Sequence, residues 1–420
     1  MSDAPARAQQ FKLASLTLGV FLPTFLFSIG QGAIIPIIPL FAKDLGASLA
    51  LASLVVAMRG VGQMLSDLPS GLAASRFGDK RTMIGGTLLM GVVAVGAALS
   101  GSPAVLGVLV LLMGAGWAAW QVGRLSYVSE MTPIDQRGRA LALVGGANRA
   151  GTFVGPIIGG FLGKAYGLES AFYAQAALAL LAALLMLVAI RKSSFAPGQD
   201  GHGAGGRMLA TISDQRGIFL SAGLPIMALQ VLRQGRQIFL PLWGDSIGLD
   251  VAQIGLVYGA SSFIDSWMFY PVGHVMDHWG RKWTAVPCLL LLSLSLLLLP
   301  LTTEVYAFFL IALLAGLGNG LGTGIVMTLG ADFAPEGRRG EFLGVWRFVA
   351  DLGSAGGPLA VSFIVGIASL GLASVASGGF GLLGAAALWL FVPETLRRNQ
   401  PHVIPATAPP APETAAEKRP

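Results

Sequence analysis

The sequence predicts an all-α membrane protein in which twelve transmembrane helices form two pseudo-symmetric six-helix bundles. Three observations support this fold class: a scarcity of charge, apolar segments of helical length along the chain, and an internal repeat. Only 11% of the 420 residues are charged, and the mean hydropathy is +0.71. Soluble domains carry roughly a quarter charged residues because their surface faces water, so we expect lipid around this chain.

Apolar segments of about 20 residues, enough to cross the hydrocarbon core as a helix, recur throughout the sequence. They are rich in Leu, Ala and Gly and lack the alternation of membrane β-strands, which predicts helices. The predicted spans lie near residues 16–41, 50–72, 82–100, 104–126, 139–161, 169–190, 217–243, 251–272, 283–301, 304–328, 341–365 and 371–392. The first segment is longer than a signal-peptide core, so we expect it to be retained.

The domain boundaries follow from changes in composition along the chain. Residues 1–190 are expected to form the N-terminal six-helix bundle, and residues 217–392 the C-terminal bundle. Residues 191–216 are polar and Gly-rich, which fits a cytoplasmic linker between the bundles. Residues 393–420 are rich in Pro and Ala and predict a disordered C-terminal tail.

Basic residues indicate the orientation in the membrane. If both termini are cytoplasmic, Lys43 and Lys164 are the only Lys or Arg residues predicted on the external side. This asymmetry is what the positive-inside rule expects, and it predicts a multi-pass protein of the inner (plasma) membrane. The net charge of +6 then faces anionic lipid and requires no nucleic-acid partner.

An offset of 202 residues aligns the two halves without a gap from the first span to the fifth. The offset pairs prolines and an Arg-Gly dipeptide as well as glycines, so the abundance of glycine does not explain it. The matched pairs include Pro39 and Pro241, Gly46 and Gly248, Gly78 and Gly280, Arg137 and Arg339, and Pro156 and Pro358. Parallel repeats about an axis along the membrane normal are typical of one large class of transporters.

The loops after the second and eighth spans carry the same motif. The first reads GLAASRFGDKR from Gly71, and the second reads GHVMDHWGRK from Gly273. Both loops resemble the G-x-x-x-D-R-x-G-R-K loop of the major facilitator superfamily, and the resemblance covers essentially the whole chain. In that family the loop latches the halves together in the outward-facing state. The resemblance therefore implies latch residues at Gly71, Arg76, Gly78, Lys80, Gly273, Asp277, Gly280 and Arg281, with Ser75 replacing the acid of the first copy.

The fifth span contains a glycine-rich motif that resembles the one marking the drug:proton antiporter branch of this superfamily. Its matching residues are Gly151, Gly155, Pro156, Gly159 and Gly160. The leading glycine of the motif is absent, because Ala142 stands there. The fourth span has Val110 where that branch has an arginine, and the first span lacks an acid. The motif implies efflux, and the alternative is that small residues merely let two helices approach closely.

Charged side chains within predicted spans are functional candidates, because burying a charge in the membrane costs several kcal/mol. They are Arg59, Asp67, Arg149, Arg233, Arg236, Asp265, Arg347 and Asp351. The repeat duplicates none of them in kind, since Arg149 aligns with Asp351, Gln63 with Asp265, and Gln31 with Arg233. Divergence at polar positions within a copied scaffold predicts a binding site between the halves.

Two ion pairs between the halves are predicted from depth in the membrane. In the superfamily, spans 2 and 11 meet, as do spans 5 and 8. At about 1.5 Å of rise per residue, Arg59 matches Asp351 in depth, and Arg149 matches Asp265 approximately. We expect these pairs to take part in proton coupling or gating, with Asp67 in the gate. The alternative is a static pair that only satisfies two buried charges.

The seventh span supplies most of the predicted substrate-binding residues. Gln230, Arg233 and Gln237 fall on one helical face with Arg236 beside it, and Gln31 is the mirror position on the first span. Gln121 on the fourth span and Asn319 on the tenth are further candidates. Two arginines on such a face would attract an anionic or strongly hydrogen-bonding substrate.

The function expected from these features is proton-coupled efflux of small organic molecules by alternating access. Two alternatives remain open: proton-coupled uptake of an organic anion, and a transporter-like assembly factor that does not cycle. No nucleophile–base pair, phosphate loop or metal cluster is recognisable, and Cys288 is the single cysteine. We therefore expect no enzymatic activity, no cofactor and no metal. The expected partners are a small-molecule substrate, protons and the lipid bilayer, and the expected state is a monomer.

Overall fold

The computed structural model describes residues 16–190, 212–335 and 338–396. The described part of the chain is helical and contains no β-strand. The first half begins with a short π-helix, η2 (Thr17–Phe21), that continues into α1. The remaining first-half helices are α1 (Leu22–Ile34), α2 (Ile37–Asp44), α3 (Leu49–Phe77), α4 (Asp79–Ala98), α5 (Pro103–Met131), α6 (Ile134–Tyr166) and α7 (Glu169–Ala189).

The second half repeats this order with more interruptions. Its helices are α9 (Arg216–Ser221), α10 (Gly223–Ser246), α11 (Val251–Trp267), α12 (Phe269–His278), α13 (Lys282–Leu298) with the 3₁₀ turn η3 (Leu299–Leu301), α14 (Val305–Leu321), α15 (Ile325–Phe333), α16 (Arg339–Ile367) and α17 (Leu370–Phe391). Most of the predicted linker and tail lies outside the described residues, and helix is already present at residue 212.

Ten helical segments of the described chain are long and apolar enough to cross a membrane. The two predicted spans missing from this set are α6 and the α11–α12 segment. α6 has 33 residues, but it carries Arg137, Arg139 and Arg149. α11 contains Asp265 and ends at Trp267, before α12 continues. These two segments pack against each other, so they face protein more than lipid and can hold polar groups there.

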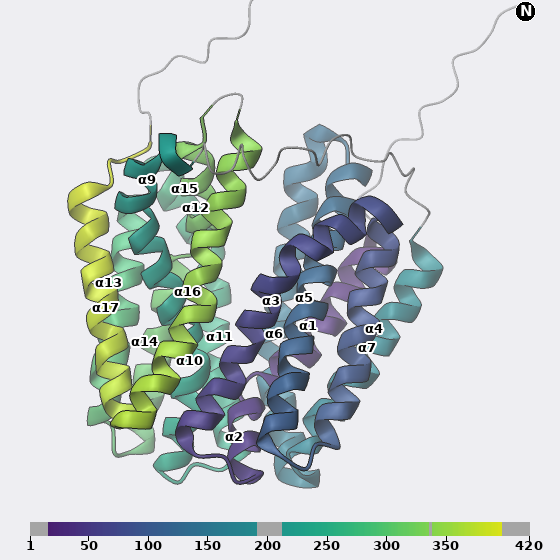
Figure 1. Cartoon of the computed structure of the whole chain (residues 1–420), viewed down its shortest axis with the longest axis vertical. Coiled ribbons are helices and arrows are strands. Elements are labelled where there is room, and N and C mark those ends of the chain that lie inside the picture. The colour runs from purple at the N-terminus through teal and green to yellow at the C-terminus, as the bar shows by residue number, and fades with distance from the viewer. Residues whose placement is uncertain (1–15, 191–211, 336–337, 397–420) are drawn as a thin grey trace, which may run out of the picture.

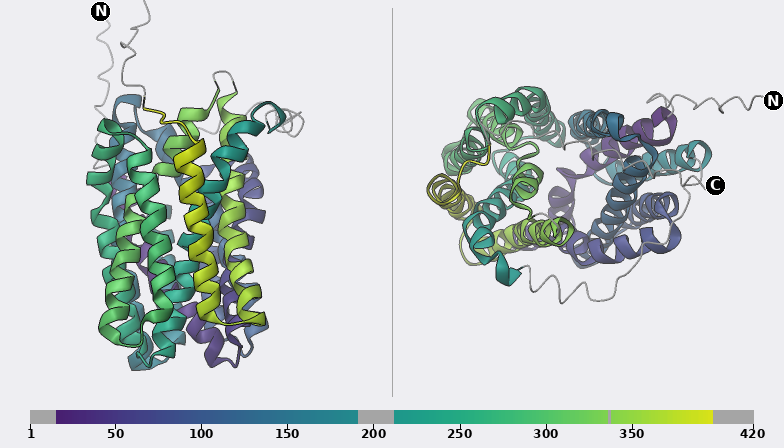
Figure 2. Two further views of the ribbon diagram at one scale, coloured as in Figure 1. Left: turned by 90° about the vertical axis from the view of Figure 1, so that its left-hand side faces the viewer. Right: turned by 90° about the horizontal axis from the view of Figure 1, so that it is seen from above.

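Helix packing follows the repeat. The first-half pairs α1/α6, α3/α5, α4/α5, α4/α7 and α1/α7 each have a counterpart 202 residues later. Those counterparts are α10/α16, α11/α14, α13/α14, α13/α17 and α10/α17. The largest contacts between first-half and second-half helices are α6/α11 and α3/α16. Figures 1 and 2 show the purple and blue first-half helices on one side and the green and yellow second-half helices on the other.

Glycines with positive φ end helices at equivalent places in both halves. Gly46 and Gly248 have φ of +90° and +85°, and Gly78 and Gly280 have +87° and +115°. Glycine adopts this region without the steric cost that a Cβ imposes, so these positions explain why the repeat retains glycine. The register also extends into the sixth span of each half: Lys80 donates to the carbonyl of Leu187, and Lys282 to that of Trp389.

Candidate functional site

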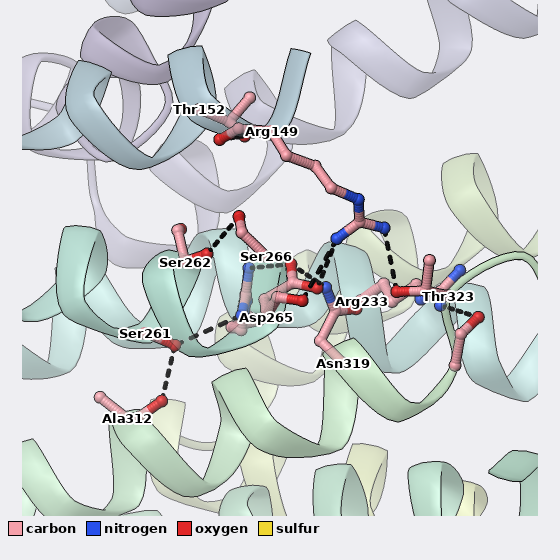
Figure 3. Close-up of polar contacts among 12 residues, drawn as sticks. Arg149, Thr152, Arg233, Ser261, Ser262, Asp265, Ser266, Ala312, Asn319 and Thr323 are labelled. Atoms are coloured by element: carbon pink, nitrogen blue, oxygen red, sulfur yellow. Dashed lines mark hydrogen bonds and ion pairs between the residues drawn. The ribbon is translucent and has the colours of Figure 1, made fainter. Parts of the chain in front are cut away.

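The contact between α6 and α11 contains the predicted ion pair of Arg149 and Asp265. Arg149 Nη1 lies 3.1 Å from Asp265 Oδ1, and Arg149 Nη2 donates to Thr323 Oγ1 at 2.9 Å (Figure 3). The guanidinium also lies over the ring of Phe269, with its carbon 5.2 Å from the ring centroid. The pairing itself is confirmed, and its part in coupling stays a prediction.

Asp265 has two further partners besides Arg149. Asn319 Nδ2 donates to Asp265 Oδ2 at 2.6 Å, and Arg236 Nη2 lies 4.0 Å from the same oxygen. Arg236 is buried, donates to Ser261 Oγ at 3.3 Å and lies over the ring of Tyr258. Arg236 and Asn319 were predicted to bind substrate, but in this arrangement their side chains contact Asp265.

The contact between α3 and α16 has a different charge pattern. Arg347 lies between two carboxylates: its Nη2 is 3.7 Å from Asp67 Oδ1, and its Nε is 3.7 Å from Asp351 Oδ2. Asp67 comes from α3, whereas Arg347 and Asp351 lie one turn apart on α16. The two carboxyl groups are close enough to interact with each other. One arginine therefore serves two acids at this contact.

The predicted Arg59–Asp351 pair is wrong. Arg59 Nη2 donates to Gln31 Oε1 at 2.7 Å, and its guanidinium lies 5.4 Å from the Trp117 ring centroid. Asp351 instead pairs with Arg347, four residues before it on the same helix. Helical rise predicts the depth of a residue but not the direction in which its side chain leaves the helix, and Arg59 points toward α1 and α5.

A cavity of about 590 Å³ lies beside the α3/α16 contact. Its lining includes three residues that were predicted to bind substrate or to couple protons, Gln121, Arg233 and Asp351. Gln63, Gln230, Trp346 and Arg347 also line it. Gln31, Arg236, Gln237 and Asn319 do not line it. The repeat could have identified Gln63 as a site residue, because Gln63 is the counterpart of Asp265. No sequence pattern identifies Trp346, since an aromatic residue in a membrane span usually serves in packing.

Hydrogen bonds behind the cavity wall orient its polar groups. Arg124 donates to Gln121 Oε1 at 2.5 Å, and because arginine has no acceptor, the amide nitrogen of Gln121 is left for other partners. Arg233 Nη2 donates to the carbonyl of Gly322 at 2.7 Å, and its Nη1 to Gln230 Oε1 at 3.4 Å. Its Nε has no hydrogen-bond partner within the described chain. The wall therefore offers mainly donors, with Asp351 as its acid.

Ion pairs between the halves join the opposite end of the molecule, where α2 lies in Figure 1. Lys43 pairs with Asp245, which is its own repeat counterpart 202 residues later. Lys164 Nζ lies 2.8 Å from Asp250 Oδ2, and Asp250 also caps α11. The hydrogen bond from Lys164 holds the pKa of the Asp250 carboxyl below its ordinary value. Lys43 and Lys164 are the two basic residues predicted to be external.

The predicted latch loops contact their own halves in this structure. Lys80 donates to the carbonyls of Leu187 and Ile190. Arg281 Nε lies 2.8 Å from Asp332 Oδ2, and Lys282 donates to Trp389. The Arg281–Asp332 ion pair of the second loop stays within the second half. A latch that acts between halves stays a prediction for another conformation.

The glycine motif of α6 lets two helices approach it closely. A Cβ added at Gly151, Gly155 or Gly159 would lie closer than 3.0 Å to the backbone of α1. A Cβ at Gly160 would lie 2.8 Å from the carbonyl of Val251 at the start of α11. The chain remains helical through Pro156. These contacts account for the glycines as packing residues, and their meaning for efflux stays a prediction.

Comparisons with known proteins agree with this arrangement. A family model described as the Major Facilitator Superfamily matches residues 20–242 and 233–420. An uncharacterized MFS-type transporter of Methanocaldococcus jannaschii is 21% identical over 370 residues, covering 87% of this chain and 94% of its own. Multidrug resistance protein MdtH of Edwardsiella ictaluri is 26% identical over 346 residues, covering 80% and 83%. The crystal structure of a D-xylose-proton symporter shares the fold, with a TM-score of 0.70, 18% identity and coverage of 91% and 98%.

Proposed function

Because this chain belongs to the major facilitator superfamily, we propose that it exports small organic molecules in exchange for protons by alternating access. As a member it is a multi-pass membrane protein and a secondary transporter, not an enzyme. Within this proposal the chain crosses the membrane twelve times. Ten crossings are the apolar helices, and the other two are α6 and the α11–α12 segment. The twelve crossings form two bundles. The protein lies in the inner membrane with both termini in the cytoplasm, and it acts as a monomer.

The observation that carries the proposal is that a carboxyl group and hydrogen-bond donors line one cavity. Asp351 shares the 590 Å³ cavity with Gln121 and Arg233. Exchange requires that a proton and a substrate do not occupy the site together. A substrate that hydrogen-bonds to Gln121 and Arg233 would crowd the Asp351 carboxyl and favour release of its proton. The same cavity then alternates between a proton and a substrate.

The two ends of the molecule support an inward-facing assignment for this conformation. The cavity lies toward the end that carries α12 and α15 in Figure 1, because Gly324, at the N-cap of α15, and Val326, Met327 and Ala331 of α15 contribute to its lining. At the other end, Lys43–Asp245 and Lys164–Asp250 join the halves. Alternating access would break these external pairs and close the cavity side, where the motif loops lie.

Two observations support export as the direction of transport. A relative 26% identical carries the name multidrug resistance protein, and the α6 motif resembles that of drug:proton antiporters. Uptake of an organic anion with a proton is the second candidate. It is favoured by Arg59, Arg124 and Arg233, whose hydrogen-bond partners in the described chain are neutral groups. An anion beside Arg233 and a protonated Asp351 would travel together.

Everted membrane vesicles distinguish the candidates. Respiration acidifies the vesicle interior, and an exported compound from a broad panel is expected to accumulate inside while the acidity falls. In D351N vesicles, exchange of labelled for unlabelled compound should continue while the pH response disappears. D214N, which alters an exposed cytoplasmic acid paired with Arg338, should behave as wild type. Movement of an organic anion out of the vesicles together with protons would favour symport. No response to any compound of the panel would favour the third alternative, a transporter-like factor that does not cycle.

A further inference from the structure

The start of α13 holds an anion that belongs to the chain itself. The Glu394 carboxylate accepts from the backbone N–H of Arg281 at 2.9 Å and from that of Lys282 at 3.0 Å. Burial raises the pKa of Glu394, but the hydrogen bonds from the backbone outweigh burial and hold its pKa below the ordinary value. The carboxylate is therefore kept in its charged form. In the second half, the backbone N–H groups at the start of α13 therefore already bind an anion, the Glu394 carboxylate.

The first half builds the same framework at the start of α4. Gly78 and Gly280 precede the two helices with positive φ. Lys80 and Lys282 donate to the carbonyls of Leu187 and Trp389, each at 2.9 Å and each one repeat apart. The backbone N–H groups of Asp79 and Lys80 therefore correspond to those that hold Glu394.

Among residues 16–190, 212–335 and 338–396, no carboxylate from elsewhere in the chain is hydrogen-bonded at this place in the first copy. The register puts Lys192 opposite Glu394, and a lysine has no acceptor. No hydrogen bond from a capping side chain is present at the start of α4 within the described residues. A cavity of about 650 Å³ lies there instead, lined by Arg76, Phe77, Gly78, Asp79, Lys80, Arg81, Ile84, Gly85, Leu88 and Leu187.

The charge and polarity of this cavity restrict its occupant. Three basic residues face one acid, Asp79, which is buried and hydrogen-bonded to Ser126 of α5. The wall becomes apolar away from the loop, along Ile84, Leu88 and Leu187. Leu88 and Leu187 are 38% and 50% exposed, and the outer faces of α4 and α7 continue this exposed apolar surface. An occupant that matches both parts has an anionic head and an apolar tail.

We propose that this cavity binds the headgroup phosphate of an anionic phospholipid from the cytoplasmic leaflet. The first N–H groups of α4 and the side chains of Arg76 and Arg81 supply donors to the phosphate, as helix starts and basic clusters do for such groups. An acyl chain lies along Leu88 and Leu187. The lipid takes the place in the first half that Glu394 takes in the second. It thereby binds the loop predicted to latch the halves.

Native mass spectrometry of the purified full-length protein tests the proposal. The protein is titrated with dioleoyl phosphatidylglycerol, with dioleoyl phosphatidylcholine and inorganic phosphate as comparison probes. One phosphatidylglycerol is expected to bind more tightly than phosphatidylcholine, and inorganic phosphate should not displace it. R76Q/R81Q should weaken binding about 25-fold, since each basic residue near an anionic headgroup contributes roughly five-fold. R338Q removes a charge from the exposed Arg338–Asp214 pair and should retain wild-type affinity.

Several results would overturn this site. Equal binding of the two lipids, or unchanged affinity in R76Q/R81Q, would contradict an anionic lipid here. Equal weakening by R338Q would indicate general surface charge, and displacement by phosphate would indicate a free anion. If R76Q/R81Q does not purify as a folded protein, E394A decides the matter, because alanine leaves no acceptor at the two N–H groups of α13. Removing the carboxylate should open the site at α13 to a second phosphatidylglycerol, and failure to gain it would refute the equivalence of the two loops.

Discussion

The two main contacts between the halves occupy equivalent places in the repeat and differ in charge. At α6/α11, Arg149 meets Asp265, and Asn319 and Thr323 complete the hydrogen bonds of the pair. At α3/α16, Arg347 lies between Asp67 and Asp351. The first contact has more base than acid, because Arg236 also lies 4.0 Å from Asp265. The second has more acid than base and borders the cavity.

Repeat positions explain how this difference arose. Arg149 is the counterpart of Asp351, and Asp265 is the counterpart of Gln63. One copy of the contact thus became an ion pair, while the other exposed an acid and an amide to the cavity. We infer that α6/α11 holds the halves together during transport, and that α3/α16 responds to protons and substrate. The different roles of these two contacts can be tested by mutation at three places.

The largest effect is expected at the Arg149–Asp265 pair. The single reversals R149D and D265R should lower transport about 100-fold or more, because each places a partly buried charge beside a like charge, and even removing one partner of a fully buried pair costs about 3–5 kcal/mol. The double reversal should recover much of the activity, although Arg236 will then face a like charge. Initial rates in proteoliposomes measure this. A double variant as inactive as the singles would show that the pairing is not what transport requires.

A moderate effect is expected at Asp67. D67N removes one of the two acids beside Arg347 and leaves the cavity lining unchanged, because Asp67 does not line it. Transport should fall by about five-fold, the upper range for a partly exposed ion pair, while the ratio of protons to substrate stays constant. Simultaneous recording of pH and substrate in proteoliposomes tests this. Loss of coupling in D67N would move the proton site from Asp351 to Asp67.

The smallest effect is expected at the external end of α6/α11. K164Q should raise the outward-open population about two-fold, since exposed pairs contribute roughly 0.2–1 kcal/mol. The lowered pKa of Asp250 means that the pair stabilises the closed end fully above pH 3.8 and is lost only as pH falls through that lowered pKa. The difference in spin-label distances between K164Q and wild type across this end should thus be independent of pH near neutrality. A change in that difference between about pH 6 and 8 would contradict this reasoning.

The sequence alone determined the class of protein and its symmetry. The low charge content, the apolar segments of helical length and the 202-residue register depend only on composition and residue spacing. Both of these can be determined from the sequence without coordinates. The register also identified Arg149 and Asp265 as divergent positions, and their depths matched well enough to predict the pair. Glycine was required at Gly78 and Gly280 because the backbone there has positive φ.

Tertiary structure decided which polar groups meet. Depth along a helix follows from residue number, but the direction of a side chain depends on how the helix is rotated against its neighbours. Arg59 therefore turned to Gln31 rather than Asp351, and Arg236 turned behind Asp265 rather than into the cavity. The occupation of the α13 start by Glu394 also needed coordinates, because 112 residues separate Glu394 from Lys282 along the chain. Contacts between distant residues are set by packing, which the sequence specifies only collectively.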